Sequence, residues 1–134
     1  MKKVKINSSD FAKRLGAYSH GYAVEVGDAT LIFTTGQIAL DKNGNVVSPG
    51  DAVKQAEFIY QSLEKILRKA GATLDDVIKT TVYVTNMADF PKISAVRNQF
   101  LKNSEPASSL VEVSKLVKEG CVVEIEVIAV VQMR

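Results

Sequence analysis

The chain has 134 residues, a length typical of one domain, so a single domain over residues 1–134 is predicted. Apolar residues make up 46% and charged residues 24%, an ordinary globular composition that argues against a disordered chain and against a membrane protein. The formal net charge of +2 comes from scattered charges, and this bias is too weak to predict a nucleic-acid partner.

Two features of the sequence bear on the compartment. The first ten residues contain lysines, but no apolar segment follows them, so no secretory signal is predicted. The only cysteine, Cys121, cannot form a disulfide within the chain, which fits a reducing compartment. We therefore expect a cytoplasmic protein.

The first third of the chain predicts strands. A short strand is expected at residues 4–7. Further on, apolar residues at 22, 24 and 26 alternate with polar neighbours, and a strand-like run at 31–35 follows the turn pair Gly27-Asp28. These two segments predict a β-hairpin. Residues 41–45 are rich in turn formers and predict a loop.

The clearest helical pattern follows this loop. Ser48 is the expected N-cap, with Pro49 at the first helical position and Asp51 completing a capping box. Apolar residues then recur at helical spacing through residues 53–70, and Gly71 predicts the end of the helix.

The next two segments predict one strand and one helix. Residues 77–85 are rich in β-branched side chains, and Ile78 is expected to share a face of this strand with Thr80. A second helix is expected at about residues 89–101, with Pro91 in its first turn.

Two further strands are predicted, at about residues 108–114 and 122–132. The last strand has one apolar face, whereas its other face carries Glu124 and Glu126 before it becomes apolar again. Two helices cover only one face of such a sheet, so the face with the glutamates is left to solvent or to another subunit. Apolar side chains on this face, with Leu110 among them, favour a subunit interface.

Several enzyme classes lack the residues they need. A zinc deaminase requires a Cys-x-x-Cys pair, and a serine or cysteine triad requires a histidine base. His20 is the only histidine, and no Gly-x-Ser-x-Gly motif or Gly-rich phosphate loop accompanies it. If the protein is an enzyme, we expect it to act without a metal or a tightly bound cofactor.

Several short motifs carry a resemblance to a known family. They are Leu15-Gly16-Ala17-Tyr18, Thr34-Thr35-Gly36-Gln37-Ile38, Lys79-Thr80-Thr81-Val82-Tyr83-Val84, Pro106-Ala107 with Val111-Glu112-Val113, and Val123-Glu124-Ile125-Glu126-Val127-Ile128-Ala129-Val130. On these motifs the chain resembles, over nearly its whole length, the Rid family of reactive-intermediate deaminases. That family is also called YjgF and was formerly labelled endoribonuclease L-PSP or translation inhibitor.

The resemblance implies a chorismate-mutase-like α+β fold, in which a mixed β-sheet carries two helices on one face. It also implies a homotrimer with a central barrel and with ligand clefts between the subunits. The implied reaction is the hydrolysis of short-lived enamines and imines to a carbonyl compound and ammonia. This reaction needs a positioned water and a base.

The family motifs also suggest site residues. By position, Glu124 resembles the acid that holds the water, Tyr18 the tyrosine that lines the cleft, and Thr35 with Gly36 the pair that contacts the substrate. Other interpretations stay open: a solvated carboxylate, an interface aromatic and a residue that packs within a strand. Glu126 lies on the same face as Glu124, so the sequence does not decide which of the two holds the water.

The chain departs from the family at the carboxylate anchor. Active deaminases carry an arginine after Pro-Ala, but this chain has Ser108, which cannot form a bidentate pair with a carboxylate. Leu110 replaces a common cysteine, Ser94 stands at the family asparagine, and the loop 117–122 has one extra residue. Arg97 is a candidate for a substitute cation that contacts the substrate, and the alternative is an arginine that faces solvent.

Three functions follow, in a fixed order. The leading hypothesis is a metal-free imine or enamine deaminase whose substrate class is altered because Ser108 replaces the arginine. The second is a non-catalytic trimer that binds a small molecule or regulates a protein. Ribonuclease or translation inhibitor is third, because the chain offers no acid, base and basic groove for RNA. The expected partners are further copies of the chain and a small-molecule substrate, with no membrane.

Overall fold

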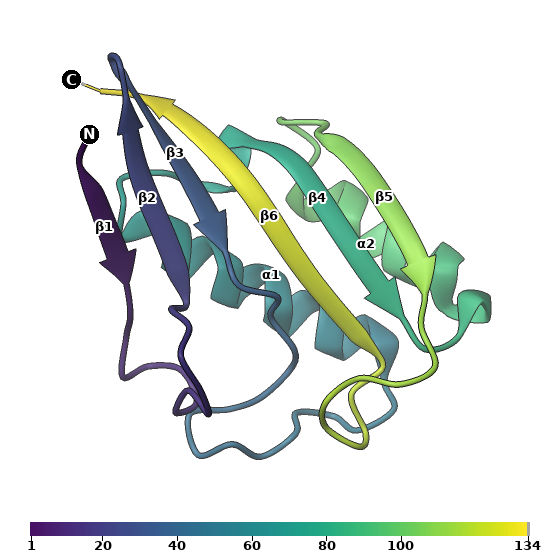
Figure 1. Cartoon of the computed structure of the whole chain (residues 1–134). Helices are drawn as coiled ribbons and strands as arrows, with labels where there is room; N and C mark the ends of the chain where they lie inside the picture. The colour runs from purple at the N-terminus through teal and green to yellow at the C-terminus, as the bar shows by residue number, and fades with distance from the viewer. Residues whose placement is uncertain (134) are drawn as a thin grey trace.

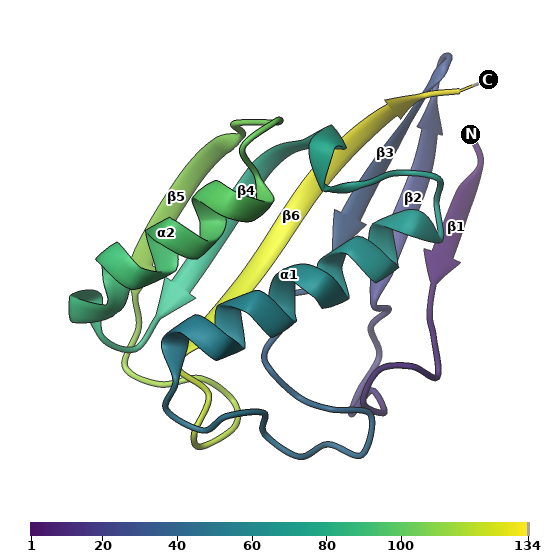
Figure 2. The ribbon, with the colours of Figure 1, turned by 180° about the vertical axis from the view of Figure 1, so that it is seen from behind.

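The computed structural model describes residues 1–133 and contains one six-stranded sheet with two α-helices on one face (Figure 1, Figure 2). The elements in chain order are β1 (Lys3–Ile6), β2 (Gly21–Val26), β3 (Ala29–Thr34), α1 (Ala52–Arg68), β4 (Val77–Val84), α2 (Phe90–Phe100), β5 (Ala107–Glu112) and β6 (Val123–Gln132). Two short 3-10 turns, η1 (Leu74–Asp76) and η2 (Met87–Asp89), precede β4 and α2. The predicted α+β class, with both helices on one side of a mixed sheet, is confirmed.

The strand order β1-β2-β3-β6-β4-β5 places the last strand in the middle of the sheet. Neighbouring strands are antiparallel except β4 and β5, which are parallel. The predicted hairpin of β2 and β3 turns at Gly27, whose φ of 62° lies in the left-handed region that glycine tolerates. Because β6 lies between β3 and β4, it is one of the two central strands of the sheet (Figure 1).

The side chains of β6 that point toward the helices form part of the hydrophobic core. Four alternate residues are each at most 1% exposed: Val123, Ile125, Val127 and Ala129. On the opposite face Glu124 and Glu126 are half-buried. The predicted difference between the two faces of this strand is therefore confirmed. Within residues 1–133, none of the helices has the length and apolar character that a membrane span requires.

α1 begins at Ala52, later than the sequence predicts. Its N-cap is Asp51, whose carboxylate accepts a hydrogen bond from the Lys54 amide at 3.0 Å. The expected N-cap, Ser48, is wrong because its φ of 45° gives it a left-handed backbone, whereas an N-cap residue is extended. The helix ends at Arg68, and the chain turns at Gly71, whose φ is 81°.

Two predicted side-chain orientations are wrong. A β-bulge between Val77 and Lys79 interrupts the pairing of β4 with β6, so Val77 is 2% exposed and Ile78 is 47% exposed. Leu110 lies beside the buried Val82 in the parallel pair of β4 and β5 and packs against the core, so it does not belong to the open face. Both errors come from local pairing that the residue pattern does not encode.

The face of the sheet away from the helices is left open by residues 1–133 (Figure 1). Apolar and polar side chains share this face on neighbouring strands: Tyr22, Phe33, Tyr83, Glu124, Glu126 and Ile128. Phe33 is 40% exposed, which is high for a large apolar residue at the middle of a sheet. This open face carries the two glutamates that the sequence singles out.

Candidate functional site

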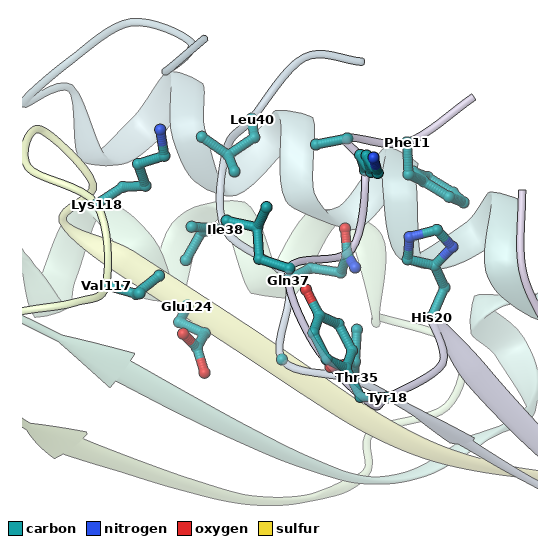
Figure 3. Close-up of a pocket in the computed structure, with 14 residues that line it drawn as sticks. Phe11, Tyr18, His20, Thr35, Gln37, Ile38, Leu40, Val117, Lys118 and Glu124 are labelled. Atoms are coloured by element: carbon teal, nitrogen blue, oxygen red, sulfur yellow. The ribbon is translucent and has the colours of Figure 1, made fainter. Parts of the chain in front are cut away.

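A cavity of about 410 Å³ opens beside the start of β6 (Figure 3). The loop before β2 supplies Tyr18, the segment after β3 supplies Thr35 and Gly36, and the loop before β6 supplies Lys118. Glu124 enters from β6 itself. Four residues that the family motifs suggest, distant in the sequence, thus line one cavity.

A close approach of Glu124 to the backbone explains the glycine at position 36. A Cβ atom at Gly36 would collide with the carboxylate of Glu124, so the carboxylate occupies space that only glycine leaves free. Next to it, Gln37 and Ile125 exchange two backbone hydrogen bonds of 2.9 and 3.0 Å. These bonds fix the segment after β3 against β6 and so hold Gly36 beside Glu124.

The two candidate carboxylates have different surroundings. Glu124 lines the cavity, and burial, followed by the nearby charge of Glu126, raises the pKa of its carboxyl group. Glu126 lies outside the cavity lining and accepts a hydrogen bond from the Tyr83 hydroxyl at 2.7 Å. Glu124 is therefore the one that a molecule in the cavity can contact. Among residues 1–133, no three His, Cys, Asp or Glu side chains are grouped to hold a metal ion.

Tyr18 stands at the rim of the cavity and is 47% exposed. The guanidinium of Arg14 donates a hydrogen bond to the Tyr18 carbonyl oxygen at 2.7 Å, which fixes the backbone of this loop. The phenol is exposed enough to contact a bound molecule or a second subunit. Both interpretations of Tyr18 therefore stay compatible with its position.

His20 is part of the cavity wall that the sequence analysis does not assign. It is 5% exposed, its Nδ1 accepts a hydrogen bond from the Ser8 amide at 3.2 Å, and its ring meets that of Phe11 edge-on at 5.0 Å between centroids. Burial lowers the pKa of this imidazole. His20 thereby holds the loop that carries Tyr18. This loop has no periodic pattern, so the sequence offers no signal for its contacts.

Gln55 on α1 joins two loops near the cavity from inside the core. Its amide nitrogen donates to the carbonyl oxygens of Val47, Ser48 and Gly120 at 3.2, 3.1 and 2.8 Å. Its amide oxygen accepts from the Val122 amide at 2.9 Å. The side chain is fully buried. It therefore fixes the loop before β6 that borders the cavity.

The remaining predicted residues lie elsewhere. Ser108 and Arg97 line a second cavity, of about 500 Å³, between α2 and the start of β5, together with Lys102 and Glu105. This cavity shares none of its lining with the cavity of Glu124. A single chain therefore does not combine the two groups of predicted residues into one site.

The two candidates on α2 differ in what they contact. The Nε and Nη2 atoms of Arg97 each lie 3.3 Å from Oδ1 of Asn98, its neighbour in the helix, so the guanidinium is held by one neutral side chain. The hydroxyl of Ser94 is buried and has no hydrogen-bond partner among residues 1–133. Arg97 thus lines the second cavity with its guanidinium bonded to Asn98, whereas the hydroxyl of Ser94 is buried one turn earlier on the same helix.

The sequence and the fold have known relatives. The family model described as Endoribonuclease L-PSP matches residues 11–131. A RutC family protein of Pyrococcus abyssi is 37% identical over 129 residues, which are 96% of this chain and 98% of that protein. The 2-iminobutanoate/2-iminopropanoate deaminase of Mus musculus is 35% identical over 125 residues, which are 93% of this chain and 89% of that protein.

A solved structure extends the likeness to three dimensions. A Rid family protein of Yersinia pestis, described as a protein of unknown function, has a TM-score of 0.85 and 32% identity, and the match covers 97% of this chain and all of that chain. The family match spans most of the chain, and both the sequence and the fold agree with it. The chain belongs to the Rid family, whose family model bears the older description endoribonuclease L-PSP.

Proposed function

We propose that this protein hydrolyses reactive imines and enamines to a carbonyl compound and ammonia. The observation that carries the proposal is Glu124, a half-buried carboxylate whose pKa is raised by burial and which lines a cavity of about 410 Å³. The name of the mouse relative, a 2-iminobutanoate/2-iminopropanoate deaminase, supports this class of reaction.

The chemistry asks little of the protein because a protonated imine is already an electrophile. The oxygen of a bound water forms a bond to the imine carbon while Glu124 takes one of the water's protons. Glu124 then gives this proton to the nitrogen of the carbinolamine, and the C–N bond breaks. Ammonia leaves while the Glu124 carboxylate takes the proton of the hydroxyl, which becomes the carbonyl. An enamine enters the same route after its β-carbon takes a proton from solvent. The raised pKa of Glu124 makes it a stronger base than an exposed glutamate.

The proposal includes a homotrimer, as the family resemblance predicts. The open face of the sheet carries apolar side chains such as Phe33, which is 40% exposed, and a second copy of the chain would bury them. Association would also provide what a single chain lacks, because the cavity of Ser108 and Arg97 on one subunit would face the cavity of Glu124 on another. Tyr18, Thr35 and Gly36 would then contact the substrate from the side of Glu124.

The proposed substrate class follows from the serine at position 108, where the family's active deaminases carry an arginine that binds the substrate carboxylate. A serine at position 108 cannot clamp a carboxylate, so we propose imines in which the carboxylate is absent or is bound elsewhere. Arg97 supports the second possibility because it lines the same cavity as Ser108 and, within residues 1–133, its guanidinium forms hydrogen bonds to Asn98 and no ion pair.

The role of the missing arginine can be tested by restoring it at position 108. Ser108→Arg should raise kcat/KM for 2-imino acids about tenfold, the value of one charge-assisted pair of hydrogen bonds. Gln61→Arg is the matched control, since it adds the same charge on the exposed side of α1. Equal rates for both variants and the wild type would reject the missing arginine as the cause of altered specificity.

A second function is favoured by the same serine. If the lost anchor has removed catalysis, the cavity of Glu124 binds a small molecule for another purpose, and the protein is a binding or regulatory trimer. Both functions require that a small molecule binds in the cavity, but only the enzyme hydrolyses an imine.

The deciding experiment generates iminopyruvate and other imines in solution and follows the release of ammonia. Glu124→Gln should lower the catalysed rate by at least about 100-fold, because it removes the base. Glu57→Gln on α1 makes the same charge change on the helix layer and should leave the rate unaltered. If the wild-type protein hydrolyses no imine faster than its spontaneous decay but still binds a small molecule, the binding function replaces the enzyme.

A further inference from the structure

The open face of β6 holds a cluster of three polar residues rather than one carboxylate. Tyr83 on β4 is the register partner of Glu124, yet its hydroxyl crosses diagonally to Glu126 and donates a hydrogen bond to it at 2.7 Å. Glu124 instead points its carboxylate over Gly36 into the cavity. The two glutamates are two residues apart on one strand face, roughly 7 Å along the strand. They are therefore close enough to interact strongly by charge.

We propose that Tyr83 and Glu126 form a positioning pair for the reaction: the hydrogen bond from the phenol holds the Glu126 carboxylate beside Glu124, and the charge of this carboxylate favours transfer of a proton from the attacking water to Glu124. The inference rests on the proposed hydrolysis and deepens it, because it assigns different roles to two carboxylates that the sequence leaves equivalent. Glu126 and Tyr83 need not touch the substrate in this arrangement.

The charges and hydrogen bonds of this cluster explain why Glu124 and Glu126 take different roles. Two neighbouring carboxylates repel each other, and a proton on Glu124 relieves this repulsion. Tyr83 donates its hydrogen bond to Glu126 and not to Glu124. Burial disfavours the charged form of Glu124 and raises its pKa, and the charge of Glu126 adds to the effect. The proton therefore belongs on Glu124.

The phenol is suited to remain the donor. Its hydrogen bond to Glu126, with smaller contributions from burial and from the charges of both glutamates, raises the pKa of Tyr83. The hydroxyl therefore keeps its proton over the pH range in which the carboxylates titrate. A phenylalanine at this position would leave both carboxylates on β6 and remove only the hydrogen bond to Glu126.

The other ionisable groups around Glu124 do not replace the pair. Lys13, Lys118 and His20 line the same cavity, but no lysine or arginine within residues 1–133 lies within 4.0 Å of the Glu124 carboxylate. Burial raises the pKa of Cys121, before β6, which favours its neutral form. On β4, Lys79 donates to Ser109 at 3.1 Å. Glu126 is thus the negative neighbour whose charge acts on Glu124.

The test measures the titration of Glu124 and the pH dependence of hydrolysis in the same proteins. Carbon-13 NMR of the glutamate carboxyl carbons follows the titration without any substrate. Glu126→Gln should lower the titration midpoint of Glu124 by roughly half a unit to one unit, from two charges about 7 Å apart in a partly aqueous surrounding. Tyr83→Phe should lower it by a smaller amount, because both carboxylates remain and only the hydrogen bond that holds Glu126 beside Glu124 is lost.

The kinetics should follow the titration. In Glu126→Gln the acidic limb of the kcat profile should move to lower pH by the same interval, and kcat on the plateau should fall roughly two- to fivefold because Glu124 is a weaker base. Glu57→Gln, which removes a charge on α1, should change neither the limb nor the titration. A structural role for Glu126 would reduce kcat without moving the limb.

Two results are decisive and distinguishable. If the wild type hydrolyses imines but both variants keep the titration midpoint and acidic limb of the wild type, the positioning pair is overturned and the proposed function stands. If the wild type hydrolyses no imine, the proposed function itself fails, whatever the titration shows.

Discussion

The two faces of the sheet are built on different principles. On the covered face, α1 and α2 close the core, and even the polar side chain of Gln55 has partners for both ends of its amide. On the open face, apolar and charged side chains share one surface, with Phe33 40% exposed and Glu124 half-buried at its edge. The chain completes the first face by itself. Residues 1–133 leave the second face open, and Glu124 of the candidate site lies at its edge.

This difference separates stability from function along a single strand. Ile125 contributes to the core, whereas Glu124 and Glu126 on either side of it contribute to the open face. Substitutions on the covered face should therefore change the free energy of unfolding. Substitutions on the open face should change association or activity and leave the fold intact.

The largest effect is expected on the covered face, at Gln55. Gln55→Leu has a similar volume but leaves three carbonyl oxygens and one amide without their buried partner, so we expect a loss of about 2–4 kcal/mol in the free energy of unfolding. Urea denaturation measures it. Gln61→Leu, on the exposed side of α1, is the matched control and should change stability by less than about 0.5 kcal/mol. Equal effects of both would contradict the role of these hydrogen bonds.

On the open face, Ile128 tests association. Ile128→Glu puts a charge beside Phe33, its register partner, and burying that charge between subunits would be costly. We expect the variant to shift from trimer to monomer in sedimentation or light scattering at the same concentration, with an unchanged far-ultraviolet circular dichroism spectrum. Gln61→Glu on α1 should remain a trimer. A monomeric wild type would show that the open face is not a subunit interface.

The residue pattern predicts the fold well because it records burial. The alternation on β6 and the apolar spacing of α1 each follow from one face being removed from water, and both are confirmed. The pattern misplaces Ile78 because a bulge changes the face without changing composition. It also misses Gln55, whose hydrogen-bond partners come from loops far away in the sequence.

The candidate site is less predictable than the fold for a related reason. Family motifs suggest Glu124, Tyr18, Thr35 and Gly36, and the structure places all four at one cavity. Glu124 lines the cavity, whereas Glu126 accepts a hydrogen bond from the hydroxyl of Tyr83 on another strand, and no pattern in β6 records this difference. The loop held by His20 has no periodicity, so its contribution to the cavity comes from tertiary contacts alone.

A methyl group at position 36 should reduce activity and leave stability nearly unchanged. Gly36→Ala would collide with the Glu124 carboxylate and displace it from the cavity wall. Because a displacement of about 1 Å in a catalytic group costs up to about 100-fold, we expect imine hydrolysis to fall by about 10- to 100-fold while Tm changes little. Gly16→Ala is the control, since its Cβ atom would meet only the Tyr18 ring at 3.8 Å, an ordinary contact. Full activity in Gly36→Ala would argue against Glu124 as the base.

The smallest effect is expected at His20, a residue of the cavity wall whose protonation should make the stability of the protein depend on pH. Burial holds the pKa of the folded His20 below the unfolded value near 6.5, so the unfolded chain binds the proton more readily. Stability should therefore be complete above about pH 6.5 and decline as the pH falls toward the folded pKa, because protonation also removes the acceptor at Nδ1 that holds the Ser8 amide. Thermal unfolding between pH 7.5 and 5 should show this decline, on the order of 2 °C in Tm, superimposed on the titration of the carboxylates. His20→Asn keeps a side-chain acceptor but cannot take up the proton, so its profile should be flatter by that amount, and a profile parallel to the wild type would mean that His20 is not the group that titrates.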